Sequence, residues 1–243
     1  MVYFLKLAVN DIRNVIRDRF LVFLLFAYPV MLIIFSRILV HLIAPRIENM
    51  FPLAANFSLI FMFFIVIIPF IFSFIVAFLI LDERDEHLLT VLRVMPISRN
   101  SFLMYRMFFM SLFAFIVLLI FPPLSGLVED TQFSYQAYIP VAIMSALFMP
   151  FLALLVSSYA TNKVQAFAIF KISGTVFMLP IFAFFLNLDN LKYIFSPIPT
   201  FWSLISLDSV VQNGTIDFAH LGVGFVYHIV LITALFYIFN NKN

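Results

Sequence analysis

Six long runs of apolar residues dominate the pattern along this chain of 243 residues. Each run exceeds the roughly 20 residues of helix that cross the hydrocarbon core of a bilayer. Open strands would leave unpaired backbone groups in lipid, and the alternation of a barrel strand is absent. The sequence therefore predicts an all-α integral membrane protein in one transmembrane domain, 1–243, with six transmembrane helices at about 20–44, 53–81, 102–124, 138–160, 164–188 and 218–239.

Composition supports the same class. Hydrophobic residues make up 65% of the chain and charged residues 11%, whereas a soluble domain is about half apolar and a quarter charged. The chain has no cysteine, which excludes disulfides and thiolate metal sites. The net charge is only +2, and its basic residues flank the apolar runs, which argues against a nucleic-acid partner. Prolines inside the runs predict kinked helices at Pro29, Pro69, Pro150 and Pro180.

The distribution of lysine and arginine predicts the orientation, because basic residues are enriched in cytoplasmic loops. The first and fifth connections hold one each, Arg46 and Lys192. The N-terminal segment, the second and fourth connections with their flanks, and the C-terminus together hold ten: Lys6, Arg13, Arg17, Arg19, Arg84, Arg93, Arg99, Arg106, Lys163 and Lys242. We therefore expect a multi-pass protein of the cell (inner or plasma) membrane with both termini in the cytoplasm.

Two cations, Arg37 and Lys171, fall inside predicted spans. Their long stems can carry the charged groups to the headgroups, or the two side chains can line a polar path through the bundle. His41 lies one turn beyond Arg37 on the same face. We expect this pair to contact Glu48 or an outer loop rather than a metal ion, because no third ligand lies nearby in the sequence.

An amphipathic helix is expected over residues 4–20, ahead of the first span. Its apolar and basic stripes both repeat at helical spacing, which is typical of a helix lying in the membrane interface. The apolar stripe is Leu5, Val9, Ile12, Ile16 and Phe20, and the other stripe is Lys6, Asn10, Arg13 and Arg17.

The fifth connection, about 189–217, is the longest segment on the outer side. It contains Pro197, Pro199 and Trp202, with enough apolar residues for a short helix or a re-entrant piece but too few for a span. The sequence "NGT" at 213–215 predicts a turn.

The second connection gathers an unusual amount of charge in the stretch "LDERDEHLLTVLRVMPISR", 81–99. Asp82 is a good N-cap, and Pro96 ends the helix that it would begin, so a short helix is expected over about 82–96. This helix would carry both a charged face and an apolar stripe, and a solvated loop rarely needs the second. We therefore expect it to dock on either the membrane surface or a soluble partner. Charge inversion at Glu83 is expected to act weakly, as rim charges do.

This stretch resembles the segment between spans 2 and 3 of type-2 ABC exporter permeases. There an acidic and basic run precedes a Leu-rich helix and Pro-x-Ser-Arg, a pattern matched by Glu83, Arg84, Asp85, Leu89, Leu92, Pro96, Ser98 and Arg99. The sequence departs from the family at His87 and Leu88, where Gly and Thr are common. The resemblance extends to "NDIRNVIRDRF", to the six spans and to the long outer connection, and it is greatest for small drug-efflux members.

The resemblance implies a permease subunit of an ATP-driven exporter that moves an amphiphilic or hydrophobic compound such as a drug. Two ATPase subunits, which bind ATP and Mg²⁺, and a second copy or a related permease would complete the transporter in the lipid bilayer. In the family, the segment is the coupling helix that fits a cleft of the ATPase. This gives its residues a coupling role: Glu83, Arg84, Asp85, Glu86, His87, Leu88, Leu89, Leu92, Arg93 and Pro96. The only substrate-path candidates are Arg37 and Lys171.

Other functions remain open at this point. An exporter of amphiphilic peptides, or an immunity transporter against them, fits the same pattern, and a channel or membrane scaffold would need no ATPase. The chain has no G-x-x-x-x-G-K-[S/T] motif, so we expect ATP hydrolysis, and any bound cofactor, on a partner chain. An intramembrane enzyme is disfavoured because the predicted spans hold no paired Asp residues and the sequence has neither a G-x-S-x-G nor an H-E-x-x-H motif.

Overall fold

The computed structural model describes residue 16 and residues 18–85 and 99–242, and every regular element in this part of the chain is helical. Six helical stretches are long and apolar enough to cross a membrane, as predicted: Arg19–Ile47, Ala54–Asp85, Asn100–Ser125, Tyr135–Tyr159, Lys163–Phe185 and Phe218–Lys242. Each begins and ends within about four residues of its expected position. The all-α, six-span fold class is therefore confirmed.

The first span consists of α2 (Arg19–Val22), η1 (Phe23–Ala27), α3 (Tyr28–Ile38), η2 (Leu39–Ile43) and α4 (Ala44–Ile47). The second, after the short η3 (Ala54–Asn56), is α5 (Phe57–Asp85), and the third is α7 (Arg99–Ser125). The remaining elements are α8 (Tyr135–Ala146), α9 (Phe148–Tyr159), α10 (Lys163–Met178), α11 (Pro180–Phe185), η5 (Asp189–Phe195), α12 (Pro199–Asn213) and α13 (Phe218–Lys242).

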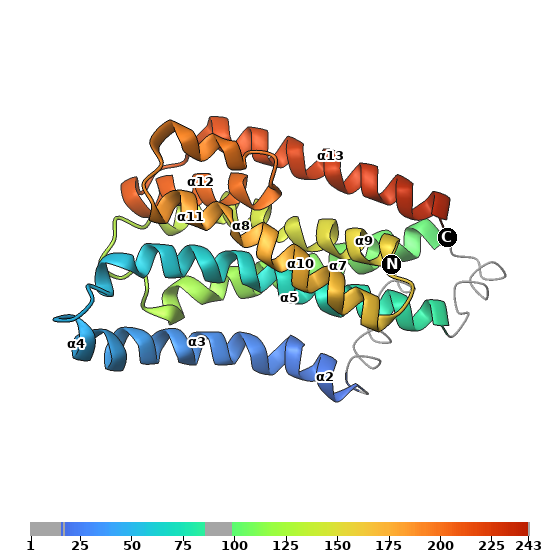
Figure 1. Ribbon diagram of the computed structural model, residues 1–243, viewed down its shortest axis with the longest axis horizontal. Coiled ribbons are helices and arrows are strands. Elements are labelled where there is room, and N and C mark those ends of the chain that lie inside the picture. The colour runs from blue at the N-terminus through green and yellow to red at the C-terminus, as the bar shows by residue number, and fades with distance from the viewer. Residues whose placement is uncertain (1–15, 17, 86–98, 243) are drawn as a thin grey trace.

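Two spans form the centre of the bundle. In the most hydropathic stretch of each span, 83% of the residues of α5 and 72% of those of α8 and α9 are buried, against 22–33% in the other four. The outer four spans therefore surround α5 and the α8–α9 pair, as Figure 1 shows. Much of the apolar surface of these outer spans faces away from the bundle, as expected of helices that contact lipid.

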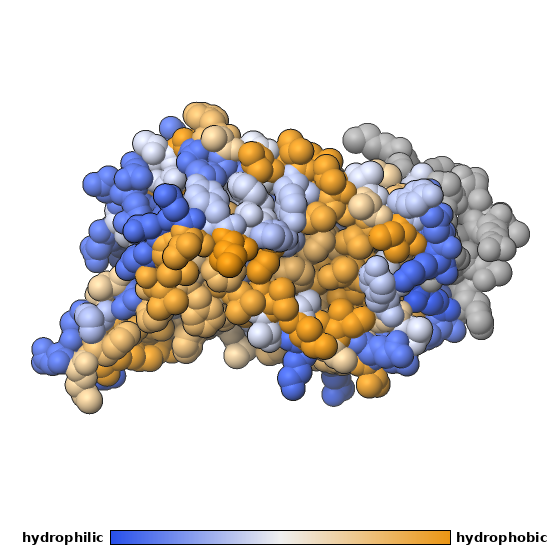
Figure 2. All heavy atoms as spheres, turned by 45° about the horizontal axis from the view of Figure 1, so that its top comes forward, coloured by the Kyte–Doolittle hydropathy of each residue, from blue (hydrophilic) through white to orange (hydrophobic). Residues whose placement is uncertain are grey.

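Polar side chains gather at the two ends of the bundle. Figure 2 shows apolar side chains over the middle of one face and hydrophilic ones toward both ends. The end of α5, the start of α7 and the end of α13 lie at one end, here called the Lys242 end, and α4 and α12 lie at the other, the α12 end. This banding is what a bilayer imposes on a spanning protein.

Prolines interrupt three of the four spans in which kinks were predicted. The π-helical turn η1 immediately precedes Tyr28 and Pro29, α8 gives way to α9 at Leu147, three residues before Pro150, and α10 ends just before Pro180. A proline has no N–H to donate and clashes with the preceding turn, so these breaks are expected. Pro69, in contrast, lies within the unbroken helix α5.

Tyrosine hydroxyls satisfy carbonyls that two further prolines leave open. Pro122 and Pro123 stand in the last turn of α7 and cannot donate to the carbonyls of Leu118 and Leu119, four residues earlier. From α8, Tyr138 donates to Leu118 O at 3.0 Å and Tyr135 donates to Leu119 O at 2.6 Å. Since lipid offers no water to a bare carbonyl, these bonds help to fix α8 against α7.

The long fifth connection contains the short helix that its sequence predicted. The 15-residue α12 packs against α13 and α8 with most of its side chains buried. Thr200 on α12 donates to Phe177 O in the last turn of α10, at 2.6 Å. Gly214 ends α12 with φ of 65°, a left-handed conformation that glycine adopts without strain, at the predicted turn.

Two sequence expectations need correction or lie beyond the described residues. Asp82 is not an N-cap, because α5 continues without a break through Asp82 to Asp85. Most of the helix expected over 82–96 and of the interfacial helix expected over 4–20 lies outside the described residues. Near the end of the expected interfacial helix, Asp18 caps α2, and its Oδ1 lies 2.8 Å from Phe20 N. Arg19 and Phe20, the last two residues expected in the interfacial helix, therefore belong to the first span.

The two glycines of α13 provide a matched test of helix packing. A Cβ on Gly224 would come within 2.3 Å of Met144 Sδ and 2.9 Å of Trp202 Cβ, whereas a Cβ on Gly222 would meet nothing within 4 Å. We expect Gly224→Ala to destabilise the protein by about 1–3 kcal/mol through overpacking. Gly222→Ala should be neutral or slightly stabilising, because alanine is the better helix former. Thermal unfolding of both variants in detergent measures this, and equal midpoints would contradict the close packing of α13.

Candidate functional site

A buried ion pair joins the last turn of α5 to the first turns of α7. Arg106 Nη1 and Nη2 each lie 2.5 Å from a carboxylate oxygen of Glu83, and the Arg106 side chain is fully buried. The Arg106 guanidinium also lies over the Phe102 ring, 4.6 Å from its centroid. The planar fork of arginine matches a carboxylate in this two-bond geometry, so the pair fixes the orientation as well as the separation of the two helices.

The next residue of α5 binds the end of α9. Arg84 Nη2 donates to Ser157 O at 2.7 Å and Nη1 donates to Ala160 O at 2.9 Å. The last carbonyls of a helix have no partner within it and carry the negative end of the helix dipole. The Arg84 guanidinium is thus a well-matched cap for α9. Its central carbon, Cζ, also lies 5.9 Å from the centroid of the Phe239 ring on α13.

The residue before Glu83 reaches a third helix. Asp82 Oδ1 lies 2.7 Å from Lys163 Nζ at the start of α10, with both side chains partly exposed. Asp82, Glu83 and Arg84 with their partners are called the α5 clamp below. Within one turn of α5, the α5 clamp joins α5 to α10, α7 and α9, which belong to three different spans.

The α5 clamp changes the interpretation of the charged run. Glu83 was expected at the rim of a docking face, but it is 93% buried inside the bundle, and Arg84 likewise points to α9. Of the expected coupling residues, Asp85 is exposed at the end of α5. The others lie outside the described residues: Glu86, His87, Leu88, Leu89, Leu92, Arg93 and Pro96.

Arg37 is bound within the chain at the α12 end. It donates to Leu124 O at 2.7 Å and Pro123 O at 3.3 Å, the open carbonyls at the end of α7, and its Nη1 lies 2.9 Å from Glu129 Oε1. His41 Nε2 accepts from the same nitrogen at 3.1 Å. The predicted contact of this pair with a loop is confirmed through Glu129 in the connection between α7 and α8, while Glu48 instead accepts from Ala54 N.

Lys171, unlike Arg37, has no side-chain partner among the described residues. It lies on α10, its side chain is exposed, and no hydrogen bond or ion pair joins that side chain to any other described residue. It therefore remains the substrate-path candidate that the fold does not use for its own stability.

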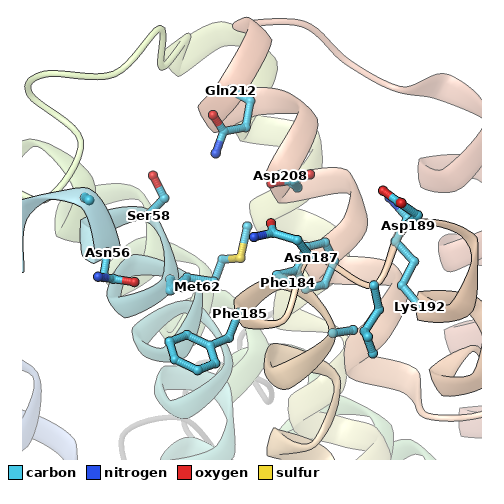
Figure 3. A pocket seen from close by; sticks show the side chains of 14 residues that line it. Asn56, Ser58, Met62, Phe184, Phe185, Asn187, Asp189, Lys192, Asp208 and Gln212 are labelled. Carbon is cyan, nitrogen blue, oxygen red and sulfur yellow. The ribbon is translucent and has the colours of Figure 1, made fainter. Parts of the chain in front are cut away.

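A small polar pocket opens at the α12 end. It has a volume of about 290 Å³ and lies between α5, the end of α11, η5 and α12. Figure 3 shows Asp208 of α12 and Asp189 and Lys192 of η5 around it, with Ser58 and Met62 of α5 among the other lining side chains. Burial raises the pKa of the Asp208 carboxyl, and the Lys192 ammonium offsets part of that rise. The pocket can hold a small polar group but is below the usual size of a drug site.

A larger apolar groove lies on the side of the bundle between α7, α9 and α13. Its volume is about 450 Å³, and its lining includes Met107 and Phe108 of α7, Pro150 of α9 and Phe236 of α13. Its lining is almost wholly apolar.

Comparison with known proteins decides the family. A family model described as "Fluoroquinolones export permease protein Rv2686c-like" matches residues 11–236, nearly the whole chain. The chain belongs to this family. It is 28% identical over 240 residues to the "Fluoroquinolones export permease protein Rv2686c" of Mycobacterium tuberculosis strain H37Rv, covering 96% of this chain and 92% of that protein. The "Fluoroquinolones export permease protein MT2760" of strain CDC 1551 matches to the same extent.

Membership in this family confirms that the chain is an export permease, a transport subunit and a multi-pass membrane protein, as the resemblance implied. The sequence did not predict the clamp partners Arg106 and Lys163 as site residues. Arg106 was counted only for orientation, although an arginine inside the apolar run 102–124 signals a buried partner. Lys163 was likewise counted only for charge, because nothing in sequence spacing pairs it with Asp82, 81 positions earlier.

The two ion pairs of the α5 clamp should differ sharply in their contribution to stability. Glu83→Gln leaves the buried Arg106 guanidinium without its carboxylate, and breaking a buried pair costs about 3–5 kcal/mol. Lys163→Gln breaks a partly exposed pair and should cost at most about 1 kcal/mol. Thermal unfolding of the purified permease compares the two variants. Similar losses of midpoint temperature would show that the Glu83–Arg106 pair is no stronger than a surface contact.

Proposed function

We propose that this permease is the membrane subunit of an ATP-driven exporter, and that a separate ATPase drives it through the connection between α5 and α7. The observation that carries the proposal is the α5 clamp. Residues 86–98 link the clamp turn of α5 directly to α7, and Glu83 and Arg106 join the same two helices side by side. A force on this connection would therefore act on two helices that a buried ion pair holds together.

The α5 clamp supports transmission over several helices. Arg84 holds the end of α9, and Asp82 holds the start of α10. α5 and α9 are the buried centre of the bundle, so displacement of the clamp turn must move that centre with it. The apolar stripe expected at Leu88, Leu89 and Leu92 would supply contact area on the ATPase, and the charges around it would set register.

The ATPase partner carries ATP and Mg²⁺ in this proposal. Since the sequence has no P-loop, nucleotide chemistry belongs to two partner subunits, and a second permease, identical or related, completes the pathway. This expectation comes from the resemblance to type-2 ABC exporters. A measured mass of the intact complex equal to two permeases and two ATPase chains supports it, whereas an active particle with one permease contradicts it.

The proposed substrate is an amphiphilic, drug-like compound of the fluoroquinolone class. The names of the two mycobacterial relatives support this class. The exposed spans present many phenylalanine and methionine side chains, whose soft apolar surfaces adapt to varied hydrophobic compounds. Amphiphilic peptides are the alternative substrate, and an ATPase-free channel is the alternative mechanism.

The proposed orientation has both termini in the cytoplasm, which puts the α5 clamp on the side of the ATPase. The sequence has no native cysteine, so single cysteines report accessibility directly. In intact cells, an impermeant thiol reagent should label Asn213→Cys at the end of α12 and should not label Asn10→Cys or Asn241→Cys. Labelling of Asn241→Cys from outside would reverse the orientation.

Docking of the ATPase is tested on the apolar stripe of the connection. Leu89→Asp would bury an unpaired carboxylate in the contact, at a cost of several kcal/mol. Each 1.4 kcal/mol or so weakens binding tenfold, so co-purification of the ATPase should fall by orders of magnitude. The membrane level of the permease should stay unchanged.

Leu191→Asp is the matched control, because Leu191 is 73% exposed at the opposite end of the bundle. It should leave ATPase co-purification intact. If Leu89→Asp retains the ATPase fully and exports normally, the connection does not dock on the ATPase and is an ordinary solvated loop. Glu83→Lys is not a docking test, since burial beside Arg106 makes it a folding variant instead.

A further inference from the structure

Lys171 is exposed on the outer, largely apolar surface of α10. On the surface of α10 it is surrounded by Phe167, Ile172 and Thr175, all exposed. The ring of Phe167, one turn earlier, packs against two other spans. Its centroid lies 5.0 Å from the ring centroid of Phe74 on α5 and 6.3 Å from that of Phe20 in the first span. Lys171 thus lies on the outside of the bundle, near the seam where α10 meets α5 and the first span.

Lys171 lies too deep in its span for its ammonium group to reach the lipid headgroups easily. It follows Lys163 by eight residues, or about 12 Å of helix, in a span of 23 residues that is about 34 Å long. Its Cα therefore lies only about 5 Å from the middle of that span. A four-carbon stem covers only part of the distance to the nearer interface.

No carboxylate of the described chain is available at this depth. The described acids lie in the end turns of spans or outside them: Asp18, Glu48, Asp82, Glu83, Asp85, Glu129, Asp130, Asp189, Asp208 and Asp217. A second copy of the chain would bring the same set at the same depths. Ionisable side chains within spans face partners or water-filled cavities, because lipid does not solvate their charge. Among the described residues Lys171 therefore has no acidic partner, and an anion supplied from outside the chain would provide one.

We infer that Lys171 recognises a carboxylate of the exported compound and thereby determines substrate class. The compounds favoured are amphiphiles in which a carboxylate stands beside an apolar, aromatic body. The ammonium binds the carboxylate, while Phe167 and the neighbouring apolar side chains accept the body. This inference rests on the proposed function, and it assigns to one residue the discrimination between acids and neutral analogues.

The test compares a matched pair of compounds, a fluoroquinolone carboxylic acid and its methyl ester. The permease–ATPase complex is reconstituted in vesicles, and both transport and compound-stimulated ATP hydrolysis are measured. Lys171→Gln should reduce transport of the acid by about tenfold to a hundredfold, as expected for loss of one charge-assisted hydrogen bond. Transport of the ester should change less than about twofold, which also shows that the variant is folded and coupled.

Two further variants separate charge from shape. Lys171→Arg keeps the charge and should keep the preference for the acid. Thr175→Val, one turn along the same face, keeps the charge and the shape of the surface and should leave both compounds unaffected. Equal loss of acid and ester in Lys171→Gln, or no loss of either, overturns the inference while leaving the exporter intact. A wild-type complex that transports neither compound and hydrolyses no additional ATP instead refutes the proposed function, and the inference with it.

Discussion

The buried pair of Glu83 and Arg106 is the interaction on which one end of this permease depends. Both charges have left water, so neither side chain can move far from the other without a large electrostatic cost. Because Asp82 and Arg84 stand on either side of Glu83, the pair also aligns their contacts with α10 and α9. One turn of α5 is therefore fixed in place by several neighbours at once. The connection to α7 begins only one residue beyond that turn, which makes the joint suited to transmitting force into the bundle.

A second constraint is the need to satisfy backbone carbonyls in lipid. Prolines open carbonyls near the end of α7, and side chains from other helices close them. Tyr135 and Tyr138 reach Leu119 O and Leu118 O, and Arg37 reaches Pro123 O and Leu124 O in the last turn of α7. Arg84 does the same for α9. These donors do more than compensate for defects, since each bond joins two spans and thus converts a local interruption into a tertiary contact.

The charged side chains of the spans divide according to whether the fold uses them. Arg37 and Arg106 have carboxylate partners within the chain, whereas the Lys171 side chain has none among the described residues. The same contrast separates structural from functional candidates in a transporter. A charge that stabilises the bundle is satisfied within it, and a charge that serves a substrate must be left accessible. This difference is invisible in hydropathy, which treats the three cations alike.

The sequence by itself determined the fold class, the six spans and the family resemblance, because hydropathy over twenty residues and the need for internal hydrogen bonding leave a chain in lipid few alternatives. It also located the short α12 helix and the turn at Gly214, whose left-handed conformation favours glycine. It wrongly predicted an exposed rim position for Glu83 and the start of a new helix at Asp82. Local helix-capping rules cannot say whether a charged turn ends one helix or begins another. Only the tertiary structure paired Asp82 with Lys163 and Glu83 with Arg106, and separated Arg37 from Lys171. Those outcomes depend on which helices are neighbours, and neighbouring helices are chosen by packing between residues far apart in the chain.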